Sequence, residues 1–205
     1  MKGTSFWRRL RYGRPIVVVS GLPRSGTSMA MKMLEAGGME IVTDGEREAD
    51  EDNPRGYYED ERVKDLANAP DKSWLRASRG RAVKVISFLL KDLPPSLNYE
   101  VILMRRDLTE VLASQRKMLD RRGETDETPD ERMMELWKDQ LWRVNYLLRK
   151  APQFEWVEIE YGEALRDPAA AATRIAGLVE GLDEKAMAEV VDPALYRNRA
   201  EPATD

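Results

Sequence analysis

The chain has 205 residues, 34% of them charged, and a formal net charge of -4. This length suits one α/β domain with a sizeable core, and the acidic balance argues against nonspecific nucleic-acid binding, which needs a basic surface. The chain contains neither cysteine nor histidine. Disulfides, thiol nucleophiles and Cys/His zinc sites are therefore excluded, and a general base must be a carboxylate, a lysine or a tyrosine.

The first residues, 1–13, are basic and include Phe6 and Trp7, but they lack the apolar stretch of a signal peptide. We expect a flexible basic arm here, a single domain over 14–197 and a C-terminal tail over 198–205. The apolar runs are too short to cross a membrane, so a cytoplasmic protein without a transmembrane segment is the expectation.

An apolar strand over 16–20 leads into a turn bounded by Gly21 and Gly26, and a helix is predicted over 26–36. Four residues between two glycines is the spacing of a phosphate-binding loop, whose backbone N–H groups cradle a phosphate. The lysine that reaches the terminal phosphates of ATP is replaced here by Thr27, and Arg24 places a cation inside the loop instead. This pattern indicates a nucleotide whose transferable group carries less charge than a γ-phosphate.

The next elements predicted are a short strand near 40–43, a helix over 59–69 and a buried strand over 82–86 that contains Lys84. Burying a lysine is costly unless it is paired. We therefore expect Lys84 to point out of the end of the sheet or to belong to a site.

A further apolar strand over 100–104 is followed by Arg106 and by a helix over 107–121 that carries Ser114. The carboxyl ends of parallel strands are where ligands bind in open α/β sheets. An arginine at such an end and a serine that faces it from the next helix can hold one phosphate by charge-assisted hydrogen bonds.

The remaining elements are a polar loop, a long amphipathic helix over 130–150, a strand over 155–160 that ends at Tyr161, and helices over 162–180 and 183–190. Strands that alternate with helices predict a parallel sheet covered on both faces. The expected fold class is α/β, a three-layer P-loop fold with a central parallel sheet flanked by helices.

These segments resemble sulfotransferases that use 3′-phosphoadenosine 5′-phosphosulfate (PAPS). The stretch Pro23, Arg24, Ser25, Gly26, Thr27, Ser28 is similar to their 5′-phosphosulfate loop, closest to the Pro-Arg-Ser-Gly-Thr form of bacterial and tyrosylprotein members. Arg106 and Ser114 have the spacing of the family's 3′-phosphate motif. Tyr161, which precedes an Asp-Pro helix, matches a tyrosine that lies near the adenine in the family.

The resemblance implies that Lys84 contacts the transferring sulfuryl group. Cytosolic aryl sulfotransferases have a catalytic histidine two residues later, where this chain has Ile86, so the base must come from elsewhere. Glu59 ends a segment similar to one in some bacterial sulfotransferases, and Asp44 lies close to the spacing at which tyrosylprotein sulfotransferases place a glutamate. We prefer Glu59 to Asp44, and both stay open.

The implied function is a metal-free transfer of the sulfuryl group from PAPS to a hydroxyl or amine, with Arg24 and Lys84 supplying positive charge. The acceptor is a small molecule, a carbohydrate or a peptide, and the segments 44–58 and 121–135 are predicted to form its walls and lid. Two alternatives are a small-molecule kinase or NTPase with a modified P-loop, for which Asp107 is the candidate magnesium ligand, and a non-catalytic nucleotide-binding module. A homo-oligomer is also left open.

Overall fold

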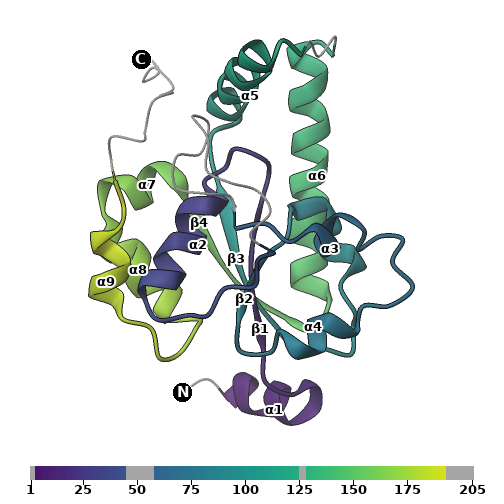
Figure 1. The fold of residues 1–205 in the computed structure, drawn as a ribbon, viewed down its shortest axis with the longest axis vertical. Coiled ribbons are helices and arrows are strands. Elements are labelled where there is room, and N and C mark those ends of the chain that lie inside the picture. Colours follow the sequence, from purple (N-terminus) through teal and green to yellow (C-terminus); the bar gives the residue numbers. More distant parts are fainter. Residues whose placement is uncertain (1–2, 45–57, 125–127, 193–205) are drawn as a thin grey trace.

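The computed structural model describes residues 3–44, 58–124 and 128–192 (Figure 1). Four parallel strands form its sheet in the order β2-β1-β3-β4. Their bounds are Ile16–Gly21 for β1, Ala82–Lys84 for β2, Tyr99–Arg105 for β3 and Phe154–Glu160 for β4. In the register of the sheet, Val18 of β1 lies between Val83 of β2 and Val101 of β3.

Helices alternate with the strands as the sequence predicts, but α1, α4 and the 3₁₀ helix η1 are not among the predicted helices. Their bounds are Gly3–Tyr12 (α1), Thr27–Ala36 (α2), Glu61–Lys64 (α3), Ser73–Ala77 (α4), Leu108–Arg122 (α5), Asp130–Lys150 (α6), Tyr161–Arg166 (α7), Pro168–Ala176 (α8) and Glu184–Glu189 (α9), with a 3₁₀ helix η1 over Ser87–Asp92. The predicted strand near 40–43 is reduced to a single bridge between Ile41 and Ala82.

Two predicted helices are interrupted for local reasons. The helix expected over 59–69 is helical only in the short α3, whose first turn is capped by the side chain of Asp60. The helix expected over 162–180 is divided into α7 and α8 because Asp167 accepts a hydrogen bond from the N–H of Ala170 and Pro168 occupies the first helical position.

Alternate side chains of β1 enter two separate cores, one on each face of the sheet. Val17 and Val19 pack in a core with residues of α2, α8 and α9, whereas Ile16 and Val18 pack in a core with residues of α4, η1 and α6. Figure 1 shows these two groups of helices on opposite sides of the strands. The three-layer α/β prediction is confirmed, and β1, buried along its whole length, lies in the middle of the structure.

The flexible arm predicted for residues 1–13 is corrected by the structure, in which Gly3–Tyr12 is helical. Helix α1 is held at the amino ends of β3 and β4 by Arg8, whose guanidinium donates to Glu155 Oε2 at 2.7 Å and to the carbonyls of Tyr99 and Gln153 at 2.9 and 3.0 Å. These acceptors lie far away in the sequence, so composition alone does not reveal them. The predicted tail over 198–205 lies outside the described residues.

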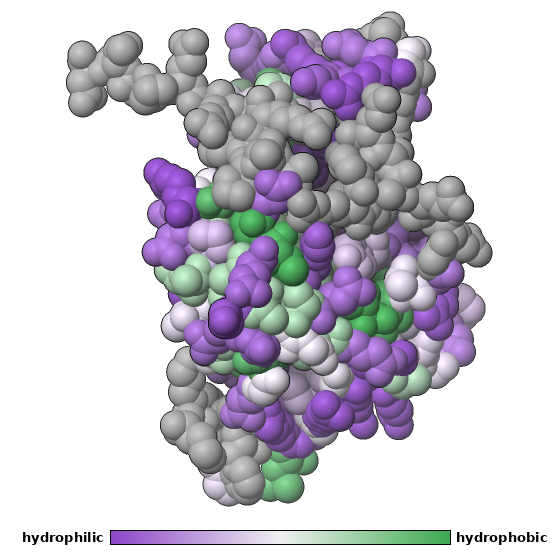
Figure 2. Space-filling model, turned by 60° about the vertical axis from the view of Figure 1, so that its left-hand side comes forward, coloured by the Kyte–Doolittle hydropathy of each residue, from purple (hydrophilic) through white to green (hydrophobic). Residues whose placement is uncertain are grey.

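The face of the molecule drawn in Figure 2 is mostly hydrophilic, and its apolar side chains are confined to small areas between charged ones. Among the described residues, no helix combines the length and the apolar composition that crossing a membrane requires.

Candidate functional site

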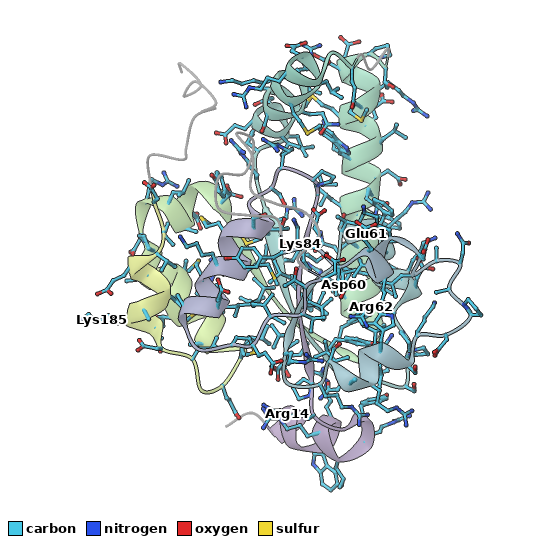
Figure 3. All side chains as sticks on the ribbon, in the orientation of Figure 1. Arg14, Asp60, Glu61, Arg62, Lys84 and Lys185 are labelled. Carbon is cyan, nitrogen blue, oxygen red and sulfur yellow. The ribbon has the colours of Figure 1, made fainter. Side chains whose placement is uncertain are left out.

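The residues singled out in the sequence lie at one edge of the sheet. Because all four strands run in the same direction, the segments that follow them meet at their carboxyl ends. Figure 3 shows Lys84 toward this edge, with Arg14 at the opposite end of the sheet. The chain crosses from one side of β1 to the other between β2 and β3, so the β1–β3 boundary is the switch point at which ligands bind in such sheets.

The loop after β1 has a tightly constrained backbone. Ser25 closes it by donating from its N–H and its hydroxyl to the carbonyl of Leu22, at 3.2 and 2.7 Å. Gly26 has a φ of 97°, and a Cβ there would lie 2.3 Å from the ring of Tyr161. Arg24 has a φ of 68°, which is strained for a residue with a side chain. The loop then opens into α2 at Thr27, where N–H groups at the start of a helix favour an anion.

Four predicted nucleotide-binding residues meet beside this loop. Arg24 Nε donates to Ser114 Oγ at 3.0 Å, and Arg106 Nη1 donates to the carbonyl oxygen of Arg24 at 3.1 Å. The guanidinium of Arg106 also lies over the ring of Tyr161, 4.6 Å from its centroid. The structure therefore brings together residues from the ends of β1, β3 and β4 and from α5.

One member of this cluster, Glu110, is missed by the sequence reasoning. Its carboxylate accepts a hydrogen bond from Arg106 Nε at 2.9 Å, and the two side chains are only 5% and 7% exposed. The signal in the sequence that could have found it is its spacing of four residues from Arg106, which lies just before α5. A buried carboxylate that pairs with one side of the guanidinium fixes the direction in which the other side points.

Tyr161 contributes an aromatic face rather than a base. Burial raises the pKa of its phenol above the ordinary value, and the neighbouring Arg106 opposes this shift without overcoming it. The phenol therefore stays neutral near pH 7. Tyr161 is therefore not a candidate for proton transfer at this edge.

The second group of predicted residues lies on the β2 side of the loop. Lys84, the last residue of β2, places its ammonium 3.1 Å from Glu59 Oε1 and 3.4 Å from Ser28 Oγ. The side chain of Lys84 is 9% exposed and that of Glu59 is 25% exposed. The pairing explains how a lysine is accommodated in an otherwise apolar strand, because the opposite charge offsets much of the cost of burial.

Asp44 supports the segment that carries Glu59. Its carboxylate accepts from the N–H of Glu61 at 2.6 Å, and its own N–H donates to the carbonyl of Glu59 at 3.3 Å. The hydroxyl of Thr43 donates to the same carbonyl at 2.8 Å. These hydrogen bonds place Asp44 against the backbone of the Glu59 segment. Residues 45–57 and 125–127 of the predicted acceptor walls and lid lie outside the described residues.

A polar hollow of about 560 Å³ opens on the outer side of Arg106, at the carboxyl ends of β3 and β4. Its lining combines arginines with carboxylates: Arg105, Arg106, Asp107, Leu108, Glu158, Glu160, Glu163 and Arg174. Asp107 caps α5 by accepting from the N–H of Thr109 at 2.7 Å, and the Thr109 hydroxyl and this N–H hold the pKa of its carboxyl below the ordinary value. In the described ranges, acidic side chains form no cluster of three that would hold a metal ion.

Comparison with solved structures identifies the type of fold. The sulfotransferase domain from the curacin biosynthetic pathway matches with a TM-score of 0.52 and 12% sequence identity, over 85% of this chain and 76% of that chain. Retinol dehydratase in a complex with retinol and PAP matches with a TM-score of 0.43 and 16% identity, over 93% and 68%. No family model matches the sequence, and no curated protein is significantly similar to it. The match to the curacin sulfotransferase domain shows that the chain has a sulfotransferase-like fold.

Proposed function

We propose that the protein is a sulfotransferase that transfers the sulfuryl group of PAPS to a hydroxyl or amine of an acceptor. The observation that carries the proposal is the arrangement at the carboxyl edge of the sheet. The loop after β1 lies between two clusters, one built around Arg106 and the other around the Lys84–Glu59 pair. The sulfotransferase-like fold supports the same assignment.

The first cluster suits the nucleotide. The N–H groups of the loop and of the start of α2 bind the 5′-phosphosulfate, and Arg106 and Ser114 bind the 3′-phosphate. The Tyr161 ring, already covered on one side by Arg106, provides an apolar surface beside the adenine. Pro23, Ser25, Gly26, Thr27 and Ser28 shape the loop that does this.

The second cluster suits the chemical step. The acceptor oxygen or nitrogen attacks sulfur, the bond between sulfur and the 5′-phosphate oxygen breaks, and its electron pair stays on the departing 3′,5′-adenosine bisphosphate. Glu59 takes the acceptor proton. Lys84 and Arg24 stabilise the charge that develops on the leaving oxygen, and alignment of the reactants supplies much of the acceleration.

The contact between Lys84 and Glu59 links these two roles. The salt bridge places the proposed base and the proposed cation within 3.1 Å of each other. Once Glu59 is protonated, its attraction for Lys84 falls, and the ammonium is released toward the leaving oxygen. Asp44 acts in this scheme by holding the backbone of the Glu59 segment, and it stays the alternative base.

The kinase or NTPase alternative needs a carboxylate to hold magnesium. Its candidate, Asp107, is engaged in capping α5, which favours the sulfotransferase. The non-catalytic module shares the nucleotide cluster and differs only in turnover. Cytoplasmic location, oligomeric state and the choice among small-molecule, carbohydrate and peptide acceptors stay predictions.

The test is isothermal titration of the wild-type protein with 3′,5′-adenosine bisphosphate and with ATP–Mg²⁺. We expect the bisphosphate to bind and ATP–Mg²⁺ to bind far more weakly, because the loop lacks the lysine for terminal phosphates and Arg106 faces a 3′-phosphate. Preference for ATP–Mg²⁺ would support the kinase instead. Binding of the bisphosphate without turnover of PAPS over a panel of phenols, sugars, amines and tyrosine peptides would support the non-catalytic module.

A further inference from the structure

The backbone of Arg24 is the strained point of the phosphate-binding loop. Its φ of 68° lies in the left-handed region, which residues with a side chain seldom adopt because the Cβ crowds the following carbonyl. Glycine adopts this conformation at little energetic cost, yet the chain has arginine here. The loop therefore depends on contacts elsewhere to keep Arg24 in this state.

Arg106 makes the contact that opposes relaxation. Its Nη1 donates to the carbonyl oxygen of Arg24 at 3.1 Å, and the N–H of the same peptide group, which belongs to Ser25, donates to the carbonyl of Leu22 at 3.2 Å. A peptide group is planar, so holding both its carbonyl and its N–H fixes its orientation. The N–H groups that follow, at Gly26 and Thr27, take their directions from this fixed peptide.

Arg106 is itself held on two further sides. Its Nε bonds to the buried carboxylate of Glu110, and its guanidinium lies over the ring of Tyr161. That ring in turn packs where a Cβ on Gly26 would be. The guanidinium is thus a rigid connection between the end of β3 and the loop after β1, and only 7% of the Arg106 side chain is exposed.

We propose that Arg106 is a positioning residue for the 5′-phosphosulfate loop in addition to its contact with the 3′-phosphate. This inference rests on the proposed function and deepens it. One side chain then serves both phosphates of the co-substrate, directly for the 3′-phosphate and through the Arg24 carbonyl for the 5′-group. Losing Arg106 must therefore weaken ligands that have no 3′-phosphate at all.

The experiment measures binding of adenosine 5′-monophosphate (AMP) and of 3′,5′-adenosine bisphosphate to four proteins: wild type, Arg106→Ala, Arg24→Gly and the double variant. We expect Arg106→Ala to weaken AMP about five- to tenfold when residue 24 is arginine, the size of one left-handed backbone penalty. With glycine at position 24 we expect a loss of about twofold or less, because glycine adopts positive φ without support. Each comparison keeps residue 24 constant, so the lost Arg24 side chain cancels.

Ser114→Ala is the comparison variant: it removes a proposed 3′-phosphate ligand and the acceptor of the Arg24 Nε–H, and it leaves the bond from Arg106 to the Arg24 carbonyl in place. It should weaken the bisphosphate more than AMP, and its loss of AMP binding should be smaller than that of Arg106→Ala. Should Arg106→Ala fail to fold because the buried Glu110 carboxylate loses its bond to Arg106, Arg106→Ala/Glu110→Ala removes both charges and is expected to show the same loss for AMP.

The outcomes separate this inference from the function on which it rests. If the wild type binds both nucleotides and Arg106→Ala weakens only the bisphosphate, the function stands and the positioning role is overturned. An equal loss of AMP binding with arginine and with glycine at position 24 overturns it as well. If the wild type binds neither nucleotide, the proposed function fails, and the positioning role fails with it.

Discussion

The two sides of the phosphate-binding loop are built in different ways. On the β3–β4 side, Arg106 and Glu110 are almost fully buried and connect the ends of β1, β3 and β4 with α5. On the β2 side, Lys84 meets Glu59, a partly exposed residue on a segment held by backbone hydrogen bonds to Asp44 and Thr43. Under the proposed function, nucleotide binding therefore rests on the packed sheet, whereas the chemical step rests on a loop placed against it.

The largest effect is expected from Lys84→Met, which keeps the length of the side chain and removes its charge. Turnover should fall about 10²- to 10³-fold, because a cation aimed at a leaving oxygen acts mainly in the transition state. Affinity for 3′,5′-adenosine bisphosphate should change much less. Steady-state kinetics with PAPS, together with titration of the bisphosphate, measures both. A collapse of bisphosphate affinity with normal turnover at saturation would show that Lys84 binds the nucleotide and has no role in the chemical step.

Glu59→Gln should lower turnover by about 100-fold, since the amide keeps the shape of the side chain but cannot take the acceptor proton. Bisphosphate affinity should be retained. Asp44→Asn is the control, with a smaller expected loss because the Asp44 carboxylate accepts from the backbone N–H of Glu61. If Asp44→Asn is the damaging change and Glu59→Gln is close to wild type, the base is Asp44.

Arg106→Ala tests the role of the β3–β4 side of the loop in nucleotide binding. We expect the affinity for 3′,5′-adenosine bisphosphate to fall by about 2 kcal/mol or more, because a charge-assisted contact is lost. AMP should lose less, since only the positioning part of the role of Arg106 applies to it. Titration calorimetry measures both losses. Equal losses for the two nucleotides would show that Arg106 does not bind the 3′-phosphate.

Gly26→Ala tests how tightly the Tyr161 ring packs against the loop after β1. The new methyl group would meet the Tyr161 ring, in addition to the strain of a positive φ. Gly38→Ala is a matched control, because Gly38 has a similar φ of 91° and open space around its Cβ position. We expect Gly26→Ala to cost at least about 1 kcal/mol more unfolding free energy than Gly38→Ala. Equal losses in chemical denaturation would mean that Tyr161 moves away freely.

EDTA should have no effect on the turnover of PAPS. The proposed transfer is metal-free, with positive charge from Arg24 and Lys84. Turnover of PAPS measured with and without the chelator, once an acceptor is found, should agree within error. A strict requirement for magnesium would revive the kinase alternative.

Much of this arrangement is predictable from sequence. Apolar runs ending in Gly21, Lys84 and Arg106 place these residues at the carboxyl ends of strands, and parallel strands bring those ends together. The pairing of Lys84 with Glu59 is harder to predict from the sequence, because 25 residues separate them and their contact depends on the path of the intervening chain. The prediction nevertheless placed Glu59 near this edge.

Other features depend on contacts that no local pattern reveals. The docking of α1 relies on Arg8 reaching Glu155, 147 residues away, so the basic stretch by itself indicates a loose arm. The strained backbone of Arg24 and its bond to Arg106 exist only in the folded loop. Glu110 is the intermediate case, since its spacing from Arg106 is visible in the sequence but its burial is not.

Our proposal for the cluster around Arg106 is that it recognises a nucleotide with phosphates at both the 3′ and 5′ positions. Titration of the wild-type protein with 3′,5′-adenosine bisphosphate and with AMP, side by side at one ionic strength, tests it most directly. We expect the bisphosphate to bind at least about 30-fold more tightly, which corresponds to about 2 kcal/mol for the charge-assisted contacts. Equal affinities for the two nucleotides would contradict it.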